Sequence, residues 1–101
     1  MTTKFDGWTM KVPVLSTGHI SQTTMKSITT GYIKTLCNET DFLLYEEGVF
    51  ISIYEDFDID KSRCLPEDFK ALLAWARSLG YNWVRLDRDG DYVDSLKVYE
   101  W

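Results

Sequence analysis

The chain has 101 residues and a mass of 11.8 kDa, enough for one domain with one modest hydrophobic core. Hydrophobic residues make up 45% and charged residues 27%, a balance typical of globular proteins and not of disordered ones. The net charge of −5 argues against binding nucleic acid through bulk positive charge, and no apolar run approaches the roughly 18 residues of a membrane span. We therefore expect residues 1–101 to form a single globular domain in the cytoplasm.

The first third of the chain predicts a strand, a turn and a weak helix. Alternating apolar and polar residues over 8–14 predict the strand, and Pro13 places it at a strand end or a sheet edge. The turn that follows ends at Ser21, a good N-cap residue. Because threonine is frequent here, we expect the helix to break near Gly31. Its apolar residues recur at intervals of three or four: Met25, Ile28, Tyr32 and Leu36.

A hairpin and a second helix come next. Residues 42–45 and 49–54 read as two strands joined by a short turn. An acidic loop separates them from a helix in which Pro66 fits the first position and Gly80 the C-cap. This helix carries an apolar stripe of Phe69, Leu72, Leu73, Ala76 and Leu79.

The end of the chain completes the expected order of elements. Residues 81–86 predict a strand, and a turn at Asp89-Gly90 precedes a short last strand over 96–101. The order is then β-α-β-β-α-β with a C-terminal extension. It predicts an α+β domain of ferredoxin-like or related architecture, an antiparallel sheet with two helices on one face.

Negative charge is concentrated in the middle of the chain. Residues 39–60 carry eight acidic side chains and no lysine or arginine, whereas residues 1–38 have a net charge of +3 and residues 61–101 have none. Such runs are often simply solvated faces, but an acidic rim with aromatic residues also suits docking onto a basic protein surface. The candidate partner-binding residues are Asp41, Tyr45, Glu46, Glu47, Tyr54, Glu55, Asp56, Asp58 and Asp60.

A calcium site is an alternative use of the acidic loop. Asp56, Asp58 and Asp60 resemble the start of a calcium loop, with Glu67 at the twelfth position. However, Lys61 stands where such a loop needs glycine, and a strand precedes the loop instead of a helix. We therefore expect no metal ion and no cofactor.

Signals for catalysis are equally weak. The stretch 87–91 follows a strand and resembles the nucleophile motif of haloacid-dehalogenase-type phosphatases, but only ten residues follow it. The one histidine, His19, has no nucleophile at a spacing typical of a catalytic site, and Cys37 and Cys64 are expected to be reduced thiols. We therefore predict that the protein is not an enzyme.

Two stretches carry a resemblance to a known family. Ser16, Thr17, His19 and Ile20 follow the first strand, and the end of the chain holds Asp87, Asp89, Gly90, Leu96, Tyr99 and Trp101. Together they are similar to the patterns S-T-x-H-I and D-x-D-G…L-x-x-Y-x-W of a small uncharacterised domain family of bacterial plasmids, phages and integrative elements. The resemblance implies an origin in a mobile element and offers no catalytic residues.

These observations favour a non-enzymatic interaction protein. We expect it to inhibit a host defence complex, in the manner of anti-CRISPR or anti-restriction proteins, by occupying a basic surface that otherwise binds nucleic acid. The partner would be that host protein, with no direct contact to nucleic acid or membrane. Two alternatives stay open: a small metal-binding or phosphate-handling protein that uses the Asp-rich turns, and a structural or regulatory subunit that forms a homodimer through a sheet edge.

Overall fold

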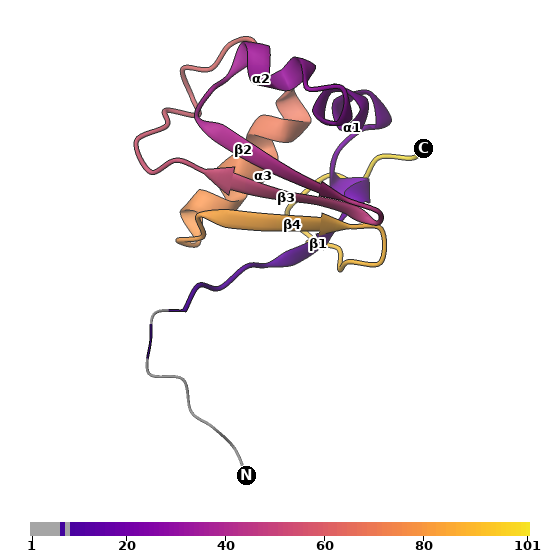
Figure 1. Cartoon of the computed structure of the whole chain (residues 1–101). Helices are drawn as coiled ribbons and strands as arrows, with labels where there is room; N and C mark the ends of the chain where they lie inside the picture. Colours follow the sequence, from indigo (N-terminus) through magenta and orange to yellow (C-terminus); the bar gives the residue numbers. More distant parts are fainter. Residues whose placement is uncertain (1–6, 8) are drawn as a thin grey trace.

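A computed structural model describes Gly7 and residues 9–101 of the chain. The elements in chain order are β1 (Val14–Ser16), the 3-10 helix η1 (Thr17–His19), α1 (Gln22–Thr29), α2 (Tyr32–Leu36), β2 (Thr40–Tyr45), β3 (Gly48–Ile53), α3 (Glu67–Ser78) and β4 (Trp83–Asp87). This is the predicted β-α-β-β-α-β order with the first helix in two parts (Figure 1). The α+β class is confirmed.

The four strands form one sheet in the order β1-β4-β3-β2 (Figure 1). β2 pairs with β3 and β3 pairs with β4 in antiparallel fashion, whereas β1 runs parallel to β4. The predicted antiparallel arrangement therefore holds for three strands, whereas β1 adds a parallel edge and makes the sheet mixed. β2 is the outer strand at the other edge.

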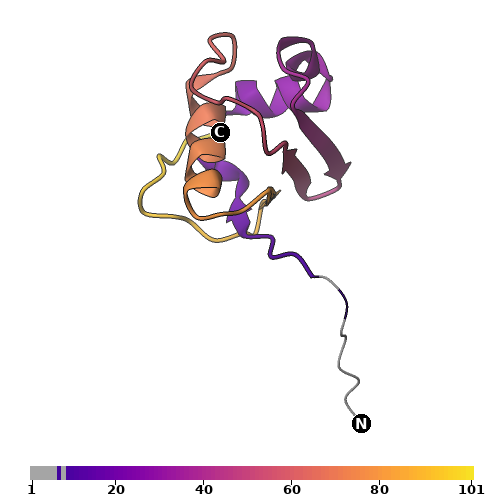
Figure 2. The same ribbon diagram turned by 90° about the vertical axis from the view of Figure 1, so that its left-hand side faces the viewer.

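One face of the sheet is covered by helices. Val49, Ile51 and Ile53 of β3 are buried and alternate with half-exposed residues, as expected of a strand with one face in the core. Val84 and Leu86 lie opposite them on β4 and are fully buried. In Figures 1 and 2, α3 packs behind this face, and no helix of the described residues lies in front of the other face. The helices thus occupy one side, as predicted.

Local sequence explains where the helices begin and end. The Ser21 hydroxyl accepts a hydrogen bond from the N–H of Thr24 at 3.1 Å and caps α1, as predicted. The predicted break falls at Gly31, whose φ of +81° is readily adopted only by glycine. Gly80, with φ of +82°, follows α3, and Pro66 is the N-cap of α3 and not its first residue. Within the described residues no helix is long and apolar enough to cross a membrane.

Both ends of the chain differ from the predicted strands. β1 begins at Val14 and buries Leu15, whereas Val14 is exposed, so the alternating pattern over 8–14 does not mark the paired segment. Trp8, which is part of that pattern, lies outside the described residues. The predicted strand over 96–101 is wrong, because these residues fold back over η1 as a loop instead of meeting a free sheet edge.

The tail, residues 88–101 after β4, is bound by hydrogen bonds to η1 and the residue that follows it. His19 is buried at 2% exposure, and its Nε2 accepts a hydrogen bond from the N–H of Val93 at 2.8 Å. Its Nδ1 must therefore carry the proton, which it donates to the carbonyl of Lys97 at 2.9 Å. The indole N–H of Trp101 donates to the carbonyl of Ile20 at 3.0 Å. The single histidine of the chain is thus a structural residue that holds the tail.

Candidate functional site

The acidic loop, residues 54–60, is held firmly against the domain. Phe57 and Ile59 are buried at 4% and 6% exposure, and the guanidinium of Arg77 on α3 donates to the main-chain carbonyls of Tyr54, at 2.7 Å, and of Phe57. The carboxylates that alternate with these buried side chains are exposed: Glu55, Asp56, Asp58 and Asp60. The loop therefore presents its charges to solvent from an anchored backbone.

Asp41 of β2 joins the acidic loop through Tyr54. The Tyr54 hydroxyl donates to the Asp41 carboxylate at 2.7 Å, and the ammonium of Lys34 lies 3.0 Å from the other carboxylate oxygen. These two hydrogen bonds, that of Tyr54 first, lower the pKa of Asp41. The same bond raises the pKa of Tyr54. Asp41 is therefore partly neutralised and is a weaker contact for a basic partner than the loop carboxylates are.

Glu46, Glu47 and Tyr45 lie at the other end of the hairpin. Glu46 and Glu47 form the turn between β2 and β3, whereas the acidic loop follows the far end of β3. Each strand has six residues, which separates the two ends by roughly 17–20 Å. The nine predicted contact residues consequently form two groups, a loop end (Asp41 and residues 54–60) and a turn end (residues 45–47). They do not form one continuous patch.

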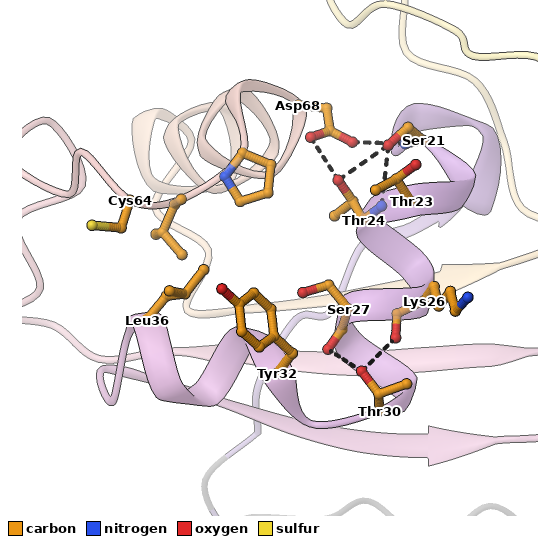
Figure 3. A pocket seen from close by; sticks show the side chains of 12 residues that line it. Ser21, Thr23, Thr24, Lys26, Ser27, Thr30, Tyr32, Leu36, Cys64 and Asp68 are labelled. Atoms are coloured by element: carbon orange, nitrogen blue, oxygen red, sulfur yellow. Dashed lines mark hydrogen bonds between the residues drawn. The ribbon is translucent and has the colours of Figure 1, made fainter.

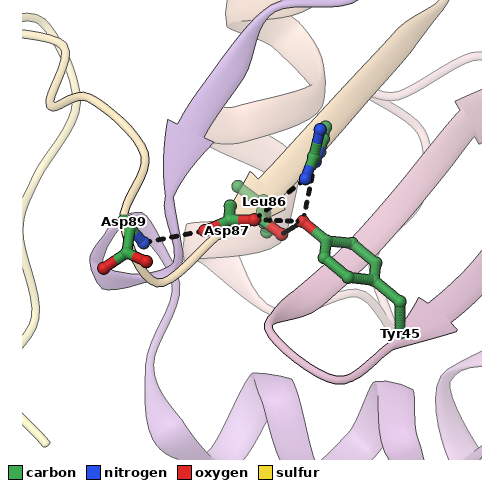
Figure 4. A network of polar contacts seen from close by, with 5 residues as sticks. Tyr45, Leu86, Asp87 and Asp89 are labelled. Carbon is green, nitrogen blue, oxygen red and sulfur yellow. Dashed lines mark hydrogen bonds and ion pairs between the residues drawn. The ribbon is translucent and has the colours of Figure 1, made fainter.

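The turn end is organised by a hydrogen-bond network around Tyr45 (Figure 4). The Tyr45 hydroxyl donates to Asp87 at 2.7 Å and accepts from Arg85 at 2.8 Å, and the guanidinium carbon of Arg85 lies 5.0 Å from the Tyr45 ring centroid and 5.3 Å from that of Phe50. Hydrogen bonds from the N–H of Asp89 and from Tyr45 lower the pKa of Asp87. Burial is the main reason why the pKa of Tyr45 is raised. Tyr45 is therefore an internal link of the sheet and a poor candidate for a partner anchor.

The Asp-rich turns carry ordinary turn contacts. Asp87, the first aspartate of the phosphatase-like motif, is engaged by Tyr45, Arg85 and the Asp89 backbone. Asp58 accepts a hydrogen bond from the N–H of Lys61 at 3.3 Å and lies 3.8 Å from its ammonium. In the part of the chain that the structure describes, no group of three or more His, Cys, Asp or Glu residues lies close enough together to hold a metal ion.

A cavity of about 830 Å³ lies between α1, α2 and the start of α3 (Figure 3). Its hydroxyl-bearing lining residues are Ser21, Thr23, Thr24, Ser27, Thr30 and Tyr32. Asp68 accepts hydrogen bonds there from the N–H of Ser21 at 2.7 Å and the hydroxyl of Thr24 at 2.8 Å. Asp68 lies in the first turn of α3, where a negative charge is favourable, and no local sequence pattern signals its bonds to Ser21 and Thr24. The polar groups at this end of the cavity therefore satisfy one another.

These features define a small acidic α+β domain with one open sheet face and an anchored acidic loop. Residues 12–101 match the model of a family of unknown function, DUF5983, over its C-terminal domain, so the chain belongs to this family. The predicted membership of an uncharacterised domain family is confirmed to that extent. No curated protein and no solved structure matches the chain.

Proposed function

We propose that the domain is a non-enzymatic interaction protein whose acidic loop docks onto a basic surface of a protein partner. In this proposal it serves a mobile element by occupying the nucleic-acid-binding surface of a host defence complex. The observation that supports it is the alternation of buried Phe57 and Ile59 with exposed carboxylates. Because the loop is already anchored, little conformational entropy is lost when it binds.

The charges of the loop end fit a partner rich in lysine or arginine. The carboxylates of residues 54–60 pair with one basic side chain in the described residues, Lys61, whose side chain is 86% exposed and lies 3.8 Å from Asp58. Asp41, the other carboxylate of the loop end, is already paired with Lys34 at 3.0 Å. An exposed pair of this kind contributes little and is easily exchanged for a partner's cation. Glu46 and Glu47 lie too far away to meet the same small basic patch, so the loop end is the primary contact and the turn end a separate one.

Capture from a bacterial lysate tests the proposal. The bait is the whole domain, either unchanged or with Asp56→Asn, Asp58→Asn and Asp60→Asn. A control variant with Asp91→Asn, Asp94→Asn and Glu100→Gln removes the same charge from exposed positions of the tail. We expect the unchanged domain and the control to capture a protein that the loop variant does not.

The captured protein should also reveal the nature of its surface. Excess duplex DNA or RNA should displace the domain from it, and capture should weaken as salt rises because exposed charges are screened. Equal capture by the loop variant and the control would refute docking through the acidic loop. Capture that is insensitive to salt and nucleic acid would refute the basic, nucleic-acid-binding partner.

A further inference from the structure

In the part of the chain that the structure describes, no strand pairs with the main-chain groups along the outer edge of β2. The N–H of Tyr54 donates to the carbonyl of Glu39 at 3.0 Å, which shows that the odd-numbered residues of this stretch direct their backbone groups toward β3. By alternation, the N–H and C=O groups of Phe42 and Leu44 point away from β3. Outside the sheet, these groups have no hydrogen bond to any described residue. An edge of this kind is a template for another strand.

A groove follows this edge on the side of the helices. A cavity of about 620 Å³ lies between the α1–α2 junction and β2, and a cavity of about 260 Å³ lies beside the turn end. Both are lined by Thr29 of α1 and Leu44 of β2, so the two cavities are adjacent along the strand, and together they are called the groove below. Figure 1 shows α1 and α2 beside β2, the strand at this edge.

The shape of the groove suits an extended chain. At the start of β2 the edge cannot pair with another strand, because the ammonium of Lys34 binds the carbonyl of Thr40 at 2.5 Å and Thr40 is fully buried. The open part of the strand runs from Phe42 to Tyr45, about 14 Å at the rise of a strand, which fits about four residues. Leu43 and Leu44 are 61% and 51% exposed on opposite faces of the strand. An added strand would therefore meet an apolar side chain on either face.

Charge indicates what the added strand carries at one end. Glu46 is exposed and Glu47 half-buried in the turn where the groove opens, and both line the smaller cavity. Arg88 also lines this cavity, so the turn offers one carboxylate in excess, which would attract a lysine or arginine at that end of the occupant. A second copy of the chain fits less well, because it would bring its own α1 and α2 to an edge that the first copy's helices already flank.

We propose that the β2 edge binds an extended segment of a partner protein as a fifth strand, with an apolar side chain in the groove beside Leu44 and a lysine or arginine beside Glu46 and Glu47. This inference rests on the proposed interaction function and gives it a binding mode. Main-chain hydrogen bonds to Phe42 and Leu44 provide affinity, and the groove and the turn end provide specificity.

The first test selects ligands without knowledge of the partner. A phage-displayed library of random heptapeptides is panned on the whole domain, and enriched peptides are synthesised and added to the isotope-labelled protein. We expect peptides with alternating apolar residues and lysine or arginine at one end. They should slow hydrogen exchange at the amides of Phe42 and Leu44. If no peptide is enriched, or if protection falls elsewhere, the proposal is overturned.

Two substitutions at one position isolate the main-chain contact. Leu44→Ala and Leu44→Pro both remove the side chain, but only proline removes the outward N–H. That N–H lies outside the β2–β3 ladder, so proline is compatible with this edge. We expect the proline variant to bind enriched peptides about tenfold more weakly than the alanine variant does, the effect of losing one hydrogen bond. Equal affinity would overturn the proposal, provided that the melting temperatures agree.

Further measurements cover the remaining outcomes. If Leu44→Pro fails to fold, Glu46→Lys replaces it and should weaken binding of the basic peptides. A different result is that the Leu44 amide becomes protected from hydrogen exchange without peptide, increasingly so at higher protein concentration, while light scattering shows a doubled mass. That result would assign the edge to a second copy of the chain and overturn the peptide site. If the acidic-loop variant fails to capture the partner from a lysate but Leu44→Pro still captures it, the edge site alone is overturned. Peptide binding at the edge without salt-sensitive capture overturns the loop proposal alone.

Discussion

The carboxylate of Asp68, on α3, accepts a hydrogen bond from the main-chain N–H of Ser21 at 2.7 Å and so caps α1 from a different helix. The same carboxylate binds the hydroxyl of Thr24 at 2.8 Å, and Asp68 is 8% exposed. The first N–H groups of a helix have no partner within it, and a charged acceptor stabilises them strongly. Asp68 therefore joins the two helical parts of the domain.

Replacing this carboxylate should destabilise the domain. We expect Asp68→Ala to lower the free energy of unfolding by about 2 kcal/mol, because it leaves the N–H of Ser21 and the buried hydroxyl of Thr24 without their acceptor. Urea denaturation followed by circular dichroism measures the loss. Glu67→Ala, at the exposed neighbouring position, is the control and should change stability by no more than about 0.5 kcal/mol. Equal losses in the two variants would contradict the capping role.

The Asp87 network should make stability depend on pH in the acid range. Hydrogen bonds from the Asp89 backbone and Tyr45 lower the pKa of Asp87 in the folded state. Its stabilising effect is therefore complete above its unfolded pKa of about 3.9 and is lost as the pH falls through the folded pKa. We expect Asp87→Asn to be less stable than the unchanged domain at pH 7, with the difference shrinking below about pH 4. Melting temperatures from pH 2 to 7 measure this, and a constant difference would contradict it.

Gly48 should not tolerate a side chain. A Cβ atom built there would lie 1.8 Å from the carbonyl oxygen of Leu86, so β3 and β4 would have to move apart. We expect Gly48→Ala to lose more than about 2 kcal/mol. Gly31→Ala is the matched control, because its Cβ meets nothing within 4 Å and only its φ of +81° is unfavourable, a cost of about 1–2 kcal/mol. Thermal unfolding compares the two, and a smaller loss at Gly48 would be inconsistent with this packing.

The two thiols should react at different rates. Cys64 is exposed, whereas Cys37 is buried and its burial raises its pKa. Because the thiolate is the reactive form, we expect one rapid reaction with a disulfide reagent at pH 8 and a second only on unfolding. Cys64→Ser should remove the rapid phase and Cys37→Ser should leave it intact. A rapid phase that persists in Cys64→Ser would show that Cys37 is accessible.

Local patterns were enough to predict most of the elements. Capping by Ser21, the break at Gly31 and the β2–β3 hairpin depend on residues within a few positions of one another, and each is present. Leu79 is an exception, since it fits the apolar stripe of α3 but is 59% exposed after the helix ends at Ser78. A periodic pattern does not show where its helix stops.

Local sequence patterns could not predict how segments far apart in the chain are arranged in the fold. The acidic residues are close together in the chain, but the two strands of the hairpin carry residues 45–47 away from residues 54–60. Tyr45 was predicted to contact a partner, but its hydroxyl binds Asp87, 42 positions further along the chain. The free edge of β2 also depends on strand order, which periodicity does not encode.

The placement of β1 bears on synthesis of the protein. Among the described residues, β4 is the one strand that pairs with β1, and the tail binds the turn that follows β1. These hydrogen-bonding partners of residues 14–20 lie some 70 positions or more further along the chain. During translation the β2–β3 hairpin can form early. Residues 14–20 can form their contacts only after residues 83–101 have been translated. Residues 83–101 therefore close this part of the fold.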